Sequence, residues 1–181
     1  GYHYLAEPAV TIHKDSGLFD IQLKVTNLSN YQSMPLQYLC HMNYAYVANA
    51  KMTANVPDNA FQLRQTIPGH VHPTPEWTAY NDRLKASGEL INKLDDPNHY
   101  DPEIVFFSSN LTEYVDNAEF RVDIGEGKNF LTTFSTKQFP IGTRWILYNP
   151  DQQVNAFVIP GTSTPEGFVA AKKAGTLIML K

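Results

Sequence analysis

Hydrophobic and polar residues alternate along several short stretches of this chain. Between Phe19 and Thr26 the odd positions are apolar and the even positions are polar. Successive side chains of a strand point to opposite faces, so this stretch predicts a strand that is buried on one face only. Similar short stretches predict further strands at residues 9–14, 51–55, 103–108, 120–124, 129–135, 143–148, 156–159 and 176–180.

Turn residues separate these predicted strands. The run Gly125-Glu126-Gly127-Lys128 is typical of a hairpin turn. Many short strands joined by turns favour a β-sandwich. No repeat, low-complexity tract or linker interrupts the pattern, so a single domain over residues 1–181 is expected.

Two segments depart from the strand pattern and predict short helices. In the first, Thr74 is a suitable N-cap, Pro75 follows it and Gly88 provides the stop. The apolar positions between these ends share one helical face: Trp77, Tyr80 and Leu84. The second helix is expected to begin with Thr164 as cap and Pro165 as first residue, and to end at the pair Lys172 and Lys173 before Gly175.

The segment that carries most chemistry is apolar and aromatic, and runs from residue 35 to residue 47. If it is a strand, Leu39, His41 and Asn43 share one face, and Cys40, Met42 and Tyr44 share the other. A histidine on a strand is commonly structural, whereas a histidine beside an amide and tyrosines is also typical of a sugar site. Both interpretations of His41 stay open at this point.

Composition narrows the classes of function. The chain has a net charge of −4 and no basic stripe, which argues against a nucleic-acid partner. No apolar run is long enough to span a bilayer. The single cysteine, Cys40, excludes an internal disulfide and favours a reducing compartment, so a cytoplasmic location is expected.

Other polar residues offer weaker candidates. The pair His70 and His72 has the spacing of an H-x-H motif, for which a structural role, a sugar contact and a metal site are alternatives. No third ligand follows at a fixed spacing, and no metal site is assigned. Arg144 and Trp145 are neighbours on a predicted strand and face opposite ways, so one can contact a sugar while the other packs, with Trp145 expected in the core.

The segments Val25–Ser29, Met34–Leu36 and His41–Tyr44 together resemble the aldose 1-epimerase (galactose mutarotase-like) superfamily. The stretches at 101–107, 143–149 and 165–168 are similar to those of an uncharacterised branch of that family. The resemblance covers the chain from Leu18 to its end. It implies an all-β, galactose mutarotase-like supersandwich of mostly antiparallel sheets with one or two short helices, of which this chain would be the C-terminal portion.

The resemblance also implies a mechanism for interconverting sugar anomers. A general base removes the proton of the anomeric hydroxyl, a general acid protonates the ring oxygen, and the opened ring turns and closes again. No cofactor or metal is required. His41 matches the family's acid, but Ile159 stands where the family's glutamate base is expected. Glu166 and Glu103 are the alternative bases.

The residues expected to bind the substrate are Asn43, Tyr44, His70, His72, Asp101 and Arg144. The chain is thus expected to be an isomerase acting on a small-molecule aldose, an aldose 1-epimerase of carbohydrate metabolism. A non-catalytic carbohydrate-binding domain on the same fold is the alternative, because Ile159 cannot move a proton. A sandwich domain that binds other proteins is a third alternative. A truncated sandwich exposes strand edges, so a homodimer is a further expectation.

Overall fold

The computed structural model describes residues 1–69, 71–108 and 110–181. The chain divides into two compact units. The first comprises Gly1–Leu36 and Leu177–Lys181, and the second comprises Gln37–Thr176. The expectation of a single domain over the whole chain stays a prediction.

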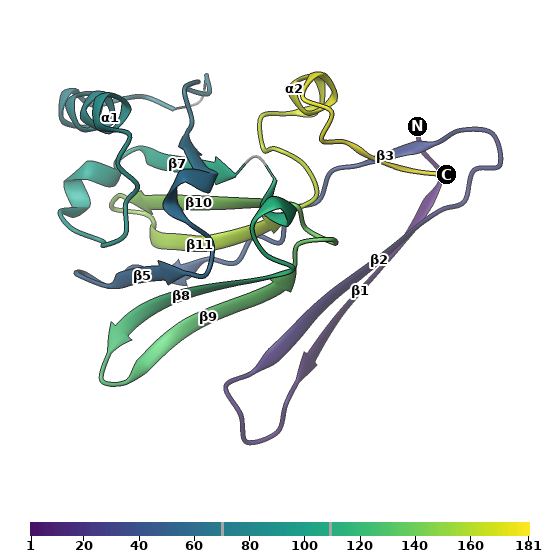
Figure 1. Ribbon diagram of the computed structural model, residues 1–181, viewed down its shortest axis with the longest axis horizontal. Helices are drawn as coiled ribbons and strands as arrows, with labels where there is room; N and C mark the ends of the chain where they lie inside the picture. Colours follow the sequence, from purple (N-terminus) through teal and green to yellow (C-terminus); the bar gives the residue numbers. More distant parts are fainter. Residues whose placement is uncertain (70, 109) are drawn as a thin grey trace. The chain divides into compact units, whose positions relative to one another are not determined.

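The first unit is built around a long hairpin. Strands β1 (Tyr4–Ile12) and β2 (Phe19–Asn27) pair in antiparallel register along their full length, as the purple ribbon of Figure 1 shows. The short strands β3 (Met34–Leu36) and β12 (Ile178–Leu180) form a second antiparallel pair. The strand predicted from the alternation at 19–26 is therefore confirmed.

The apolar row of this hairpin is half-buried at Leu23 and Val25 but is exposed near the turn, where half-burial was also expected. The register places Val10 opposite Ile21 and Ile12 opposite Phe19, so these side chains share one face. Their exposed fractions are 63%, 39%, 78% and 52%, respectively. The opposite face is polar and carries an ion pair between Lys24 and Glu7.

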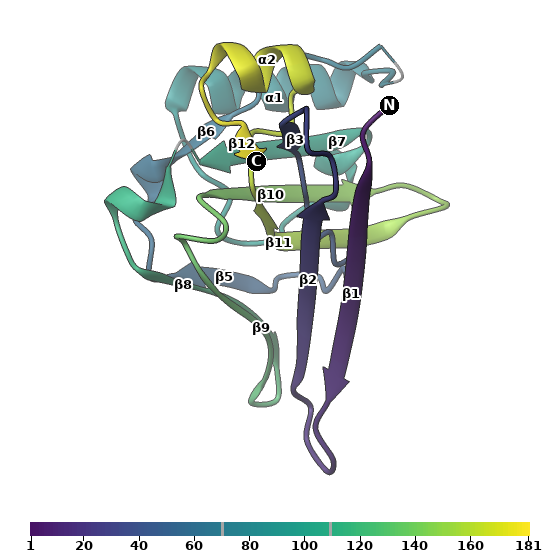
Figure 2. The same ribbon diagram turned by 90° about the vertical axis from the view of Figure 1, so that its right-hand side faces the viewer.

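The second unit contains two antiparallel sheets. The larger has the strand order β4 (Tyr44–Ala45), β11 (Gln153–Gly161), β10 (Ile141–Tyr148), β7 (Glu103–Ser108) and β6 (Phe61–Leu63). The smaller has the order β5 (Lys51–Ala54), β8 (Asn117–Gly125) and β9 (Lys128–Ser135). Figures 1 and 2 show β7, β10 and β11 side by side, with β8 and β9 beyond β11. The predicted turn at 125–128 joins β8 to β9, as expected.

Aromatic side chains join the two sheets in one core. Phe120 of β8 meets Phe61 of β6 and Phe157 of β11 edge-to-face, at ring-centroid distances of 6.0 and 5.5 Å. Phe120 and Phe157 are almost fully buried. The core thus lies against one face of the larger sheet, and its other face carries buried apolar side chains, such as Val105 and Leu147, beside polar ones.

Helix α1 (Pro75–Ser87) confirms the first predicted helix. The hydroxyl of Thr74 accepts a hydrogen bond from the backbone N–H of Trp77 at 3.1 Å, which satisfies one free donor of the first turn. Gly88 ends the helix in the left-handed conformation with φ of 66°, which glycine adopts at low cost. The predicted apolar face is buried and consists of Trp77, Tyr80 and Leu84. Three short 3-10 helices lie at Asp58–Ala60, Pro97–Tyr100 and Leu111–Glu113.

The predicted start of the second helix was wrong. Helix α2 spans Phe168–Lys173, and Gly167 occupies its N-cap position. Thr164 does not cap it, because the Thr164 hydroxyl lies 3.5 Å from the hydroxyl of Thr176. The predicted end at the two lysines is confirmed.

The segment at 35–47 differs most from its prediction. Only β3 at its beginning and the two-residue β4 are regular, and residues 37–43 run as irregular chain with a single bridge from Leu39 to Gly161. His41 therefore does not lie on a strand. His41 and Asn43 therefore do not share a strand face, contrary to the prediction.

Candidate functional site

Backbone hydrogen bonds attach the irregular segment around His41 to the end of β11. The Cys40 N–H donates to the Pro160 carbonyl at 2.9 Å. Leu39 packs so closely on Gly161 that a β-carbon there would meet its Cδ2 at 2.9 Å, so a larger residue at this position would displace the end of the Leu39 side chain. The segment is thereby fixed on the larger sheet, and His41 lies at its surface, exposed overall but with part of its ring covered by neighbours such as Trp145.

The register of the larger sheet brings three side chains to the face that carries His41. Trp145 of β10 pairs with Val105 of β7, so the two share a face. Glu103 lies two residues before Val105 and therefore points to the same face. Arg64 follows β6, and its backbone N–H donates to the Val105 carbonyl at 2.9 Å. This hydrogen bond places Arg64 beside Glu103 and Trp145.

Glu103 is held by two donors at once. Its Oε1 accepts from Arg64 Nη2 at 2.8 Å, and its Oε2 accepts from the indole Nε1 of Trp145 at 2.5 Å. The side chains of Arg64 and Glu103 are only 15% and 17% exposed. A charge-assisted pair that is shielded from water is stronger than an exposed one. Both carboxylate oxygens are therefore already engaged.

His41 packs edge-on against the indole of Trp145. The two ring centroids are 5.0 Å apart and the ring planes are inclined at 76°. Partial burial lowers the pKa of His41 below its ordinary value of 6.5, while a hydrogen bond with Asn43 and the charge of Glu103 act in the opposite direction. His41 is consequently neutral at pH 7, when its ring offers one donor and one acceptor.

We call the group His41, Asn43, Arg64, Glu103 and Trp145 the His41 face. It combines a half-buried indole, a neutral imidazole, an exposed amide and a shielded ion pair. Aromatic rings with a few convergent polar groups are typical of sites for hydroxyl-rich ligands. The arrangement suits hydrogen bonding and stacking better than proton removal, because the carboxylate is occupied.

Two residues expected to bind substrate, Tyr44 and Arg144, are engaged by other side chains of the protein. The hydroxyl of Tyr44 lies 2.6 Å from that of Thr132, and its ring stacks on Phe130 with centroids 4.7 Å apart. Arg144 is 2% exposed, and its guanidinium lies 4.3 Å from the ring centre of Phe61 and 4.4 Å from that of Phe157. The placement of Arg144 in the core is a correction, whereas Tyr44 is half-buried and its role in substrate binding stays a prediction.

The prediction that Arg144 and Trp145 face opposite ways is confirmed, but their roles are reversed. Trp145 was expected in the core, yet it is half-buried on the His41 face. Arg144 fills the core position. Burial lowers its pKa from 12.5 to about 9, although the negative charge of Asp58 acts to raise it. Its Nη1 donates to Asn92 Oδ1 at 3.0 Å.

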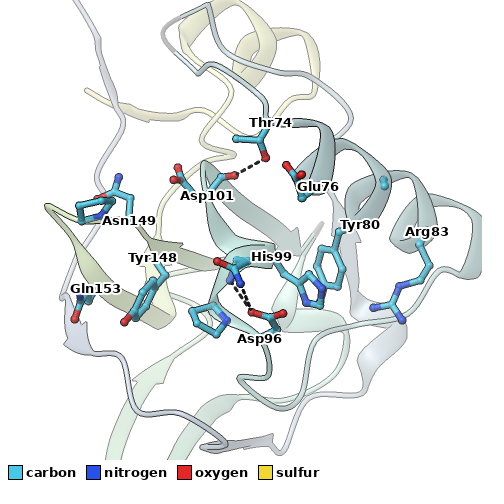
Figure 3. A pocket seen from close by; sticks show the side chains of 14 residues that line it. Thr74, Glu76, Tyr80, Arg83, Asp96, His99, Asp101, Tyr148, Asn149 and Gln153 are labelled. Carbon is cyan, nitrogen blue, oxygen red and sulfur yellow. Dashed lines mark hydrogen bonds between the residues drawn. The ribbon is translucent and has the colours of Figure 1, made fainter.

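A separate cleft lies beside α1. It has a volume of about 1020 Å³ and includes Asp101, Tyr148, His99 and Tyr80 in its lining. Figure 3 shows these side chains around it, with the ring of Tyr80 beside that of His99. Those two rings stack with centroids 4.0 Å apart. The structure thus places Asp101 in this cleft, whereas Glu103, two residues on, belongs to the His41 face.

The remaining predicted residues lie elsewhere. Glu166 is exposed just before α2, and no hydrogen bond or ion pair joins it to His41 in the described part of the chain. His72 is exposed in the irregular segment before α1. His70 lies outside the described residues. Ile159 is 2% exposed in β11, so the position expected to hold the family's base is apolar and buried.

Sequence reasoning missed Arg64 and assigned Trp145 to the core. The strand that precedes Arg64, β6, was not among the predicted strands, since it is only three residues long. The run Phe61-Gln62-Leu63-Arg64 does alternate apolar and polar residues. That alternation was the available signal that Arg64 continues the polar face of a strand.

No protein-family model and no curated protein matches this sequence. The structure is similar to the crystal structure of a putative aldose 1-epimerase from Klebsiella pneumoniae subsp. pneumoniae MGH 78578, with a TM-score of 0.72 and 17% sequence identity. The similarity covers 99% of this chain and 43% of that chain. The expected fold is confirmed. This chain has an all-β fold of antiparallel sheets with two short helices, like that of the similar protein.

At this identity the likeness shows the fold alone, and the chain spans less than half of the similar protein. Across the described residues, no helix combines the length and hydrophobicity needed to cross a membrane.

Proposed function

We propose that this protein binds an uncharged aldose on the His41 face without catalysing its epimerisation. The observation that carries the proposal is the contact between the half-buried Trp145 indole and the exposed His41 ring, at 5.0 Å. An indole offers a sugar ring an apolar wall, and the imidazole and the Asn43 amide offer hydrogen-bond partners to its hydroxyls.

Two further features favour binding over catalysis. The ring-opening mechanism needs a carboxylate that can reach the anomeric hydroxyl, but each oxygen of Glu103 already accepts one hydrogen bond and its side chain is only 17% exposed. It also needs a protonated acid, whereas burial lowers the pKa of His41 and keeps it neutral at pH 7. Ile159 supplies no substitute base.

An aldose 1-epimerase is the second candidate. It is favoured by the electrostatic interaction between Glu103 and His41, which brings a carboxylate and an imidazole into one cluster. The similar fold of the Klebsiella protein, whose description is a putative aldose 1-epimerase, supports the same candidate. Under it, His41 is the acid and Glu103 the base.

Proton NMR of D-glucose and D-galactose distinguishes the two candidates. We expect saturation transfer from the protein to the sugar, with anomeric exchange at the buffer rate. His41→Ala and Trp145→Ala should remove the transfer. His13→Ala, at an exposed histidine of the first unit, is the matched control and should retain it.

Two outcomes would contradict the proposed function, and the experiment tells them apart. Exchange that the protein accelerates and His41→Ala abolishes would establish the epimerase instead. No saturation transfer with any of a panel of neutral aldoses would overturn both candidates.

A further inference from the structure

The side chain of Arg64 is largely shielded from water and paired with a carboxylate. Its side chain is only 15% exposed, and Nη2 donates to Glu103 Oε1 at 2.8 Å. The other described arginine–glutamate pair, Arg121 with Glu119, is more exposed at 39% and 47%. A shielded pair restricts both side chains more than an exposed one does.

Glu103 is fixed at its backbone as well as at its side chain. The indole of Trp77, on α1, donates to the Glu103 carbonyl at 3.1 Å. Trp77 is 3% exposed, so this contact belongs to the core. The backbone contact with Trp77 therefore fixes the start of the Glu103 side chain, and the contact with Arg64 fixes the orientation of its carboxylate.

The second oxygen of the Glu103 carboxylate holds the Trp145 indole in place. Oε2 accepts the indole N–H at 2.5 Å, and the same indole meets the His41 ring at 5.0 Å. An indole has a single donor, so this hydrogen bond selects one orientation of the ring. The contacts form a chain from Arg64 through Glu103 and Trp145 to His41.

We propose that Arg64 is a positioning residue that, through Glu103, orients the Trp145 indole as one wall of the sugar site beside His41. This inference rests on the proposed function for the identity of the ligand. Because the Arg64 charge is already paired, the site is suited to an uncharged aldose and not to a sugar phosphate or a sugar acid. Pre-orientation of the wall removes part of the ordering cost of binding.

Fluorine NMR of protein labelled with 5-fluorotryptophan tests the orientation without any ligand. The chain has two tryptophans, so two signals are expected, and Trp145→Phe assigns them. Arg64→Met should shift and broaden the Trp145 signal, and Arg64→Lys should restore it in part because a lysine still pairs with Glu103. The matched control Arg121→Met should leave the Trp145 signal unchanged.

Affinity for D-galactose provides the second readout. Arg64→Met should weaken it by about fivefold, as expected for loss of pre-orientation and not of a direct contact. Glu103→Gln, which keeps the side-chain shape, should disturb the Trp145 signal in the same way and serves if Arg64→Met does not fold. D-galactose 6-phosphate should bind no more tightly than D-galactose.

Two results would overturn the proposal. The first is a Trp145 signal that a folded Arg64→Met variant leaves unmoved in the ligand-free protein or, where Arg64→Met does not fold, one that Glu103→Gln leaves unmoved. The second is a preference for D-galactose 6-phosphate that Arg64→Met abolishes, because Arg64 would then contact the ligand itself. The ligand-free signal reports on Arg64 even if no aldose binds, so failure of this inference and failure of the proposed function are separable.

Discussion

The Trp145 indole N–H donates to Glu103 Oε2 at 2.5 Å, and this contact joins the side chains of two neighbouring strands on the side of the larger sheet that faces His41. The same carboxylate forms an ion pair with Arg64 in which both side chains are largely shielded from water. Glu103 is therefore a structural centre of the His41 face, whatever ligand that face binds.

Glu103→Gln should lower the free energy of unfolding by about 1–2 kcal/mol. The glutamine carbonyl oxygen can accept from Arg64 or from Trp145 but not replace both charged contacts. Urea denaturation followed by circular dichroism measures the change. Glu119→Gln, in the exposed pair with Arg121, should cost less than about 0.5 kcal/mol. Equal losses in the two variants would show that shielding does not strengthen the Glu103 pair.

Sequence patterns predicted most strands of the second unit, because each carries its own apolar rows between turn residues. They failed at residues 37–43, where the segment has the composition of a strand. A strand needs a partner along its whole length, and here β11 offers only the bridge between Leu39 and Gly161. Which backbone groups remain unpaired is a property of the assembled sheet and not of the segment.

The neighbours Arg144 and Trp145 show a second limit. Alternation predicted that they face opposite ways, but not which face is the core. That choice follows from the register of β10 with β11, which places Arg144 opposite Phe157. Residues close in space but distant in sequence decide it. The guanidinium is accommodated because its flat faces stack on aromatic rings.

Arg144→Met should leave stability unchanged or raise it by about 1 kcal/mol, since a buried charge is replaced by an apolar chain of similar length. The Nε of Arg144 has no hydrogen-bond partner, so the main polar loss is the hydrogen bond from its Nη1 to Asn92 Oδ1. Arg144→Ala should instead lower the free energy of unfolding by about 3 kcal/mol, because it leaves a cavity between Phe61 and Phe157. Thermal and urea unfolding give both values.

Those two variants also test whether Arg144 contacts sugar. Since its side chain is 2% exposed, Arg144→Met should bind aldoses with unchanged affinity. A large loss of affinity in the folded Arg144→Met protein would contradict the placement of Arg144 in the core.

Thr74→Ala should destabilise the protein by about 1 kcal/mol. The variant removes the hydroxyl that accepts the Trp77 N–H at 3.1 Å and leaves a donor of the first turn of α1 unsatisfied. Thr74→Ser retains the hydroxyl and should lose far less. If both variants lose the same amount, the methyl group of Thr74 and not the cap accounts for the effect.

Buried tyrosines should make the protein sensitive to alkali. Burial, with the charge of Asp95 as the second cause, raises the pKa of Tyr46 and of Tyr80 from 10.0 to about 12. The folded state keeps these protons while the unfolded state loses them near pH 10, so their contribution to stability is full below pH 10 and is lost as the pH rises towards 12. The absorbance of tyrosinate should therefore show a late phase that coincides with unfolding.

Tyr46→Phe isolates one of these groups. The variant loses the hydrogen bond from the Tyr46 hydroxyl to the Asp95 carbonyl, at 2.8 Å, and should be less stable at neutral pH. Its stability should nevertheless decline less steeply above pH 10, because one raised pKa is absent. A decline parallel to that of the unmodified protein would assign the alkaline sensitivity to other groups.

The lowered pKa of His41 makes the opposite prediction on the acid side. Burial disfavours its charged form, so the unfolded chain takes up a proton near pH 6.5 before the folded protein does. The stability linked to His41 is therefore full above pH 6.5 and is lost as the pH falls below it. His41→Gln, which cannot be protonated, should show a shallower loss between about pH 8 and about pH 5 in urea unfolding. Asn43→Ala removes a hydrogen bond that raises the pKa of His41, so it should make the loss steeper. If Asn43→Ala and His41→Gln change the slope in the same direction, the loss of stability at acid pH does not come from protonation of His41.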